Sequence, residues 1–203
     1  MILSEAVKDR VSAAIKAAEA KTSGEIVCVL ARASSNYMSF TTAWAALISL
    51  IAPWFLIALT NLSVERIFLA QIVIFVVLFL ALSESALQRV LIPRAVRRAA
   101  AHRAAMEQFM IRGMARKKNR ASVLIFVSLA EHYARIVADD GIAAKVDQSV
   151  WQDAIQALLE DAGKGDIAEG FVIAVEKCGQ VLAEHFPPEP GQQDQLPDRI
   201  YLI

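Results

Sequence analysis

The sequence predicts an α/β domain, a three-layer α/β/α sandwich with a small mixed sheet, interrupted by an inserted two-helix transmembrane hairpin. Short apolar runs rich in β-branched residues indicate strands, and apolar residues spaced three and four positions apart indicate helices packed on them. Two long uncharged segments lie between Ser39 and Ser83. The chain of 203 residues is 56% hydrophobic, and the excess is concentrated in this stretch.

The chain is predicted to begin with a helix and a strand. From Leu3 to Lys21 the apolar residues form one helical stripe, and Ser4 is placed to cap the helix. The run Glu25 to Ala31 is apolar except at its start, which is typical of a central strand covered on both faces. The polar residues from Arg32 to Ser39 indicate a loop.

The two apolar segments, about 40–60 and 67–83, are predicted to be transmembrane helices. Phe40 to Thr60 is about 21 residues without a charge, close to the number that crosses roughly 30 Å of hydrocarbon. The second segment is about 17 residues long but denser in Ile, Val, Leu and Phe. The short link Asn61 to Arg66 makes the pair a hairpin with both ends on one side. Two buried helices of a soluble bundle are disfavoured, because neither segment carries a polar stripe.

The region after the second span is strongly basic. The positive-inside rule assigns such a region to the cytoplasm, so we expect two spans in a bacterial inner membrane, with both termini and the α/β domain cytoplasmic. The nearest arginines are placed to contact anionic lipid headgroups. Nucleic-acid binding is disfavoured, because the basic residues adjoin a span and are interleaved with few aromatics. Between Arg89 and Arg120 the single acid is Glu107, and the basic residues are Arg89, Arg94, Arg97, Arg98, Arg103, Arg112, Arg116, Lys117, Lys118 and Arg120.

The same region is predicted to be a helix that begins near Pro93. Its apolar residues recur at helical spacing and are assigned to the core: Val96, Ala99, Ala100, Met106, Phe109 and Met110. Ser122 to Ser128 and Tyr133 to Ala138 are predicted to form an antiparallel strand pair, the second nearer an edge. Two amphipathic helices follow, and Asp166 is placed to cap the second.

These elements divide the chain into three parts. A discontinuous α/β domain is predicted at residues 1–38 and 93–186, the hairpin at 39–92, and a polar, Pro-rich tail at 187–203. Two cysteines, Cys28 and Cys178, lie in apolar runs far apart in sequence. They could form a disulfide or a metal pair, but the favoured interpretation is two buried small hydrophobes in a reducing compartment.

Acidic residues are expected to gather at one edge of the predicted sheet. A right-handed crossover makes the first two strands parallel, and the third strand runs back beside the second. Glu25 therefore lies at the same edge as Asp139 and Asp140, with Asp147 and the helix start at Asp166 as neighbours. Hard divalent cations prefer such oxygen ligands, so Glu25, Asp139, Asp140 and Asp147 form the candidate metal site. The alternative is that these acids are solvated strand ends and helix caps.

No catalytic residue can be assigned from motifs. The sequence contains no Cys-x5-Arg loop, no Asp-x-Asp at a strand end and no histidine cluster suited to a two-metal site. Serine-hydrolase and P-loop signatures are also absent, and nothing indicates an organic cofactor.

An ordered set of short motifs resembles the TPM domain family, which includes thylakoid-lumen and photosystem II repair proteins and a worm acetylcholine-receptor modulator. The motifs are Ser23-Gly-Glu-Ile-Val27, Val123-Leu-Ile-Phe-Val127, Arg135-Ile-Val137, Asp140-Gly-Ile142 and Gly165-Asp-Ile-Ala-Glu-Gly170. The resemblance covers about residues 3–38 and 95–186, and Phe186-Pro-Pro188 with Leu196-Pro-Asp-Arg199 resembles a bacterial membrane-anchored branch. The segment from Asp140 departs from the family pattern, because it lacks a second glycine and an acid.

The resemblance implies an α/β/α sandwich, binding of calcium or magnesium in some members and phosphatase activity in some. We therefore expect a membrane-anchored cytoplasmic TPM-like domain that binds a divalent cation and acts on or with membrane-associated partners. One alternative is a weak metal-dependent phosphatase, and another is a non-catalytic factor for the assembly or repair of membrane proteins. The expected partners are the lipid bilayer and other membrane proteins, without nucleic acid.

Overall fold

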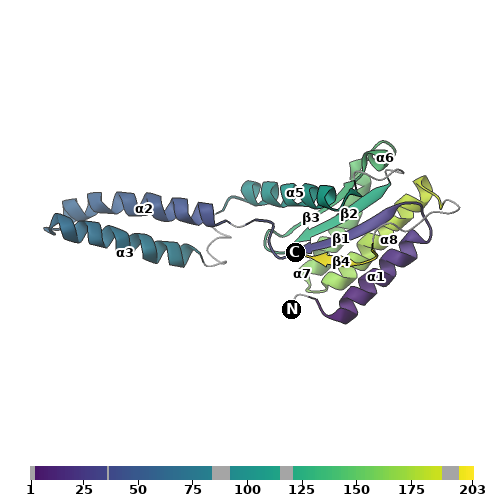
Figure 1. The fold of residues 1–203 in the computed structure, drawn as a ribbon, viewed down its shortest axis with the longest axis horizontal. Coiled ribbons are helices and arrows are strands. Elements are labelled where there is room, and N and C mark those ends of the chain that lie inside the picture. Colours follow the sequence, from purple (N-terminus) through teal and green to yellow (C-terminus); the bar gives the residue numbers. More distant parts are fainter. Residues whose placement is uncertain (1–2, 36, 84–91, 115–120, 189–196) are drawn as a thin grey trace. The chain divides into compact units, whose positions relative to one another are not determined.

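The computed structural model describes residues 3–35, 37–83, 92–114, 121–188 and 197–203. The chain divides into two compact units: unit 1 comprises Met1–Ser34 and Arg98–Ile203, and unit 2 comprises Ser35–Arg97. The α/β fold and the apolar helical hairpin predicted from the sequence are both confirmed (Figure 1).

Unit 1 is built on a mixed four-stranded sheet in the order β3-β2-β1-β4 (Figure 1). Strand β1 (Glu25–Ala31) is parallel to β2 (Ser122–Ser128) and to β4 (Ile200–Leu202), while β3 (Tyr133–Ala138) is antiparallel to β2. The predicted crossover between the first two strands and the predicted hairpin of the next two are therefore both present. As expected from its alternating pattern, β3 is an edge strand.

Helices cover both faces of this sheet. On one face lie α1 (Glu5–Glu19), α7 (Gln152–Gly163) and α8 (Ile167–His185), which enclose the larger core. On the other lies α5 (Arg94–Ile111), which contributes Ala105 and Phe109 to a second core. A short helix α6 (Asp140–Ala143) and a 3-10 turn (Gln148–Trp151) join β3 to α7. The caps expected at Ser4 and Asp166 are present, since their side chains accept hydrogen bonds from the backbone amides of Val7 and Glu169.

Strand β4 corrects the sequence analysis, which placed its three residues in a polar tail. Ile200 is buried in the larger core, and Tyr201 packs against the second one. The strand extends the sheet beyond β1 through backbone hydrogen bonds such as that from Ile203 to the carbonyl of Leu30. Strand β1 is therefore a central strand because β4, at the end of the chain, pairs with its second side.

Helix α5 corrects a second expectation. Its buried residues are Ala100, Ala101, Ala105 and Phe109. Ala99, Met106 and Met110, which the sequence analysis assigned to the core, are exposed. The sequence contains apolar residues on two sides of this helix, and the sheet covers one of them.

Unit 2 is a hairpin of two long helices, α2 (Met38–Leu59) and α3 (Val64–Leu82) (Figure 1). The buried residues of α2 are small and spaced four apart: Thr41, Ala45 and Ser49. The Thr41 hydroxyl donates to the carbonyl of Leu82 at 3.4 Å, and the Ser49 hydroxyl donates to the carbonyl of Ala46 at 2.9 Å. The helix continues through Pro53. Small residues allow the two helices to approach closely, while the larger apolar side chains point outward.

Candidate functional site

Three buried polar residues lie side by side where β1 and β2 begin: Glu25, Ser122 and Asp139. Glu25 pairs with Ser122 across the parallel strands, and the amide of Asp139 donates to the carbonyl of Ser122 at 2.9 Å. Because side chains alternate along a strand, all three belong to the face that α5 covers. Glu25 and Asp139 therefore lie at the same end of the sheet, as predicted.

Among the described residues, one carboxylate oxygen of Asp139 accepts a hydrogen bond and the other does not. Its Oδ1 accepts a hydrogen bond from the amide of Asp140 at 2.7 Å and so caps helix α6. Its Oδ2 is buried without a hydrogen-bond partner among the described residues, and so is the Ser122 hydroxyl. An unsatisfied buried polar group costs roughly 1–3 kcal/mol, and more if it is charged. Among the described residues, two such groups therefore lie close together at this end of the sheet.

The other acidic residues of the predicted set lie elsewhere on the surface. Asp140 is exposed at the start of α6. Asp147 is also exposed, and hydrogen bonds from the side chain and then the backbone amide of Ser149 lower the pKa of its carboxyl group. The neighbouring Gln148 side chain donates to the carbonyl of Ile136 at 3.4 Å, so this segment runs along β3, two strands away from Glu25. The caps predicted as the alternative are thus present at Asp139 and Asp147.

The residues at this end of the sheet, where β1 and β2 begin, fit a divalent cation only in part. Glu25 and Asp139 flank Ser122, at a backbone separation of two strand spacings, about 10 Å. Carboxylates at that separation can converge on one cation, which hard ions such as Ca²⁺ and Mg²⁺ prefer to coordinate through oxygen. Across the described ranges, no three His, Cys, Asp or Glu side chains are grouped as a metal cluster. Backbone carbonyls, the Ser122 hydroxyl or water would have to complete the coordination.

Ser122 is the member of this cluster that sequence analysis missed. A serine before an apolar run is common at a strand boundary and carries no signal of its own. Its significance comes from its burial between two carboxylates on the neighbouring strands. The register of the sheet is required to recognise it.

The cysteines do not form a site. Cys28 and Cys178 are both buried, free thiols of the larger core. Burial raises the pKa of each thiol, and electrostatic interactions with Cys178 and Glu19 raise the pKa of Cys28 further. Both are therefore neutral at physiological pH, as expected for buried hydrophobes.

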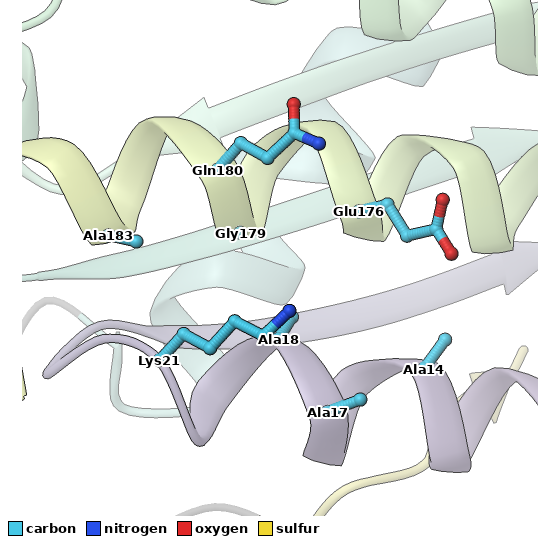
Figure 2. Close-up of a pocket in the computed structure, with 8 residues that line it drawn as sticks. All are labelled: Ala14, Ala17, Ala18, Lys21, Glu176, Gly179, Gln180 and Ala183. Atoms are coloured by element: carbon cyan, nitrogen blue, oxygen red, sulfur yellow. The ribbon is translucent and has the colours of Figure 1, made fainter.

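A groove of 420 Å³ runs between α1 and α8 (Figure 2). The helices approach closely at Gly179, where an added Cβ would lie 2.7 Å from the Cβ of Ala18. Figure 2 shows Glu176 and Gln180 on α8 and Lys21 in the turn after α1, together with small residues of the two helices. None of these lining residues has a buried polar atom without a hydrogen-bond partner in the described part of the chain, so the polar cluster at the end of the sheet is the better candidate site.

These observations define a class of protein: an α/β domain into which an apolar helical hairpin is inserted, with a buried polar cluster at one end of its sheet. Residues 83–181 match the model of the TPM domain. The chain therefore contains a TPM domain, which confirms the resemblance found in its sequence.

Among solved structures, the NMR structure of the BA42 protein from the psychrophilic bacterium Bizionia argentinensis is similar to this chain. The TM-score is 0.61 at 20% sequence identity, over 98% of this chain and 94% of that one. A similarity at this identity shows the fold. No curated protein matches the chain.

Proposed function

We propose that this protein is a membrane-anchored TPM-domain protein whose α/β domain binds a divalent cation at the edge of its sheet and acts on or with partners at the membrane. The hairpin of α2 and α3 is the anchor in this proposal. The observation that carries it is the distribution of side chains on these two helices, which is the reverse of that in a soluble protein.

Both helices are long and apolar enough to cross a membrane. Their large apolar side chains are exposed, as at Trp54, where the exposed fraction is 78%. The small and polar residues Thr41 and Ser49 lie inside the pair. An apolar surface of this extent is unfavourable in water, where exposed patches rarely exceed a few hundred Å². Small residues between helices and large apolar residues outside are typical of helix packing in lipid.

The orientation of the anchor is the first testable part. The basic residues that follow α3 favour both termini and the α/β domain on the cytoplasmic side of a bacterial inner membrane. Five of them, Arg89, Arg116, Lys117, Lys118 and Arg120, lie outside the described residues. The link between the helices, Thr60 to Ser63, would then face the outside.

We expect a cysteine introduced by Ser63→Cys to react with an impermeant maleimide added to intact cells. Ser63 is exposed and makes no side-chain capping bond to α3, so the substitution should leave the helix unchanged. The native cysteines are buried and supply little background. Ala13→Cys, in the exposed face of α1, is the matched control and should react only after permeabilisation. The reverse pattern would place the domain outside and contradict the proposed topology.

The cation site is supported by the Oδ2 of Asp139 and the hydroxyl of Ser122, which are buried without a hydrogen-bond partner in the described part of the chain. A bound cation would neutralise the carboxylates of Glu25 and Asp139 and satisfy Oδ2, which removes the cost of burying it. The exposed Asp140 and Asp147 complete the proposed set only if α6 and the following turn move toward the edge.

Calcium or magnesium is expected to raise the melting temperature of the full chain in detergent. A cation at about 100 times its dissociation constant adds roughly 2.7 kcal/mol, which is about 5–10 °C for a domain of this size. Asp139→Asn should abolish the shift while keeping the cap of α6, because asparagine caps helices as well as aspartate does. Asp153→Asn, an exposed acid of α7, is the control and should keep it. A wild-type protein that does not respond to either cation would disprove the site.

The same variants separate the alternative functions. A metal-dependent phosphatase would release phosphate from an aryl phosphate in wild type and in Asp153→Asn but not in Asp139→Asn. A cation response without phosphate release favours a binding role. Loss of membrane partners in hairpin variants with an intact cation response would favour an assembly or repair factor.

A further inference from the structure

Helix α5 has a second apolar face that the fold leaves uncovered. Ala99, Arg103, Met106 and Met110 follow one another at spacings of four, three and four, so they form one stripe along the helix. All four are exposed, and 62% of Met110 is accessible. The buried stripe, which includes Ala101, Ala105 and Phe109, points to the sheet instead.

Helix α5 carries an excess of positive charge. Between Arg94 and Ile111 the basic side chains are four arginines, and the single acid is Glu107. Glu107 forms no ion pair within 4.0 Å among the described residues. Arg98 and Arg103 are exposed, and Arg103 belongs to the methionine stripe itself. An exposed apolar stripe that contains arginine is complementary to a surface that is both apolar and negatively charged.

We propose that the Ala99-Arg103-Met106-Met110 face of α5 lies on the surface of an anionic lipid bilayer. The methionines would enter the boundary between headgroups and acyl chains, and Arg103 would contact lipid phosphates. This proposal rests on the proposed membrane anchor, because residues 83–93 are all that separate α3 from α5 along the chain. This short connection limits how far α5 can move from the end of α3.

A second copy of the chain fits this face less well. A two-fold contact between α5 helices would place the arginines of one copy against those of the other, since the same surface meets itself in such a dimer. The face carries no compensating carboxylate other than Glu107. Lipid phosphates supply the missing negative charge, and each arginine near an anionic surface is worth about 1 kcal/mol.

The test uses the full chain in nanodiscs, with an environment-sensitive NBD probe attached through Met110→Cys. In nanodiscs of phosphatidylcholine with phosphatidylglycerol we expect blue-shifted emission and quenching by doxyl-labelled lipid. The same probe at Ala13→Cys, on α1 at the opposite face of the sheet, should remain in water. Quenching at position 110 should decrease in phosphatidylcholine alone and at high salt, because screening weakens contacts between exposed charges.

A second variant keeps the proposal falsifiable without changing the probe site. Arg103→Gln in the Met110→Cys background should reduce the ratio of quenched to unquenched probe about fivefold, which corresponds to the loss of one arginine contact. The proposal would be overturned if the probe at position 110 were as exposed to water as the probe at position 13 in both lipid compositions. Shielding that occurs in lipid-free micelles and grows with protein concentration would also overturn it, and would indicate a second copy.

If the hairpin did not anchor the chain in the membrane, the experiments would give a different result. In that case the chain would not enter nanodiscs at all, and the cysteine at position 63 would show no sidedness in cells. A chain that enters nanodiscs with a water-exposed Met110 probe would leave the anchor in place and overturn only the lipid contact of α5.

Discussion

Replacing Val73 with arginine is expected to prevent stable insertion of α3 into a bilayer. Val73 lies at the middle of the helix and is 52% exposed, so its side chain would face lipid. An arginine at the centre of a span costs about 2.5–3.5 kcal/mol, and the favourable contribution of valine is lost as well. The insertion equilibrium should fall by about two orders of magnitude, since each 1.4 kcal/mol is a factor of ten. Carbonate extraction of membranes, followed by quantification of the released chain, measures this change.

Val150→Arg is the matched control for this prediction. Val150 is 47% exposed, close to the value for Val73, but lies in unit 1 before α7. A surface substitution of this kind changes stability by less than about 0.5 kcal/mol, and the chain should stay in the membrane fraction. If α2 and α3 were in water, both substitutions would be tolerated equally. Equal behaviour of the two variants would therefore refute the transmembrane hairpin.

Deletion of residues 200–203 is expected to destabilise unit 1 strongly, although the sequence analysis placed these residues in a tail. The deletion removes the buried side chain of Ile200, worth about 1.5–3 kcal/mol. It also removes the Tyr201 ring, which lies 3.5 Å from the Arg112 guanidinium and 4.7 Å from that of Arg199. Such cation–π contacts add about 0.5–2 kcal/mol. A total loss of about 3–4 kcal/mol should lower the melting temperature by about 10 °C.

Point variants localise that effect. Ile200→Ala should account for about 2 kcal/mol of the loss, because it leaves a cavity in the larger core. Ile203→Ala, at a residue that is largely exposed, should be close to neutral while preserving the backbone hydrogen bonds of β4. Thermal unfolding followed by circular dichroism measures all three proteins. A deletion as stable as the full chain would mean that β4 does not complete the sheet.

The candidate site was predicted in outline because its position follows from topology. A right-handed crossover and a strand hairpin bring Glu25 and Asp139 to one edge regardless of the loops between them. Topology did not determine the full set of four acids, because helix caps use the same residue types as cation sites. Asp139 caps α6, and its other carboxylate oxygen is buried without a partner among the residues that the structure describes. Only burial and contacts reveal this difference from an ordinary helix cap.

Local patterns determined the strands β1, β2 and β3, the amphipathic helices and the long apolar hairpin. Each is a run of six or more residues with a periodicity of its own. Strand β4 has only three residues and pairs with a strand about 170 positions earlier, so no local pattern can reveal it. On α5, two apolar stripes competed for the sheet. Tertiary packing buried the one with Phe109 and small alanines, which lets the helix lie close to the strands, and left Met106 and Met110 exposed.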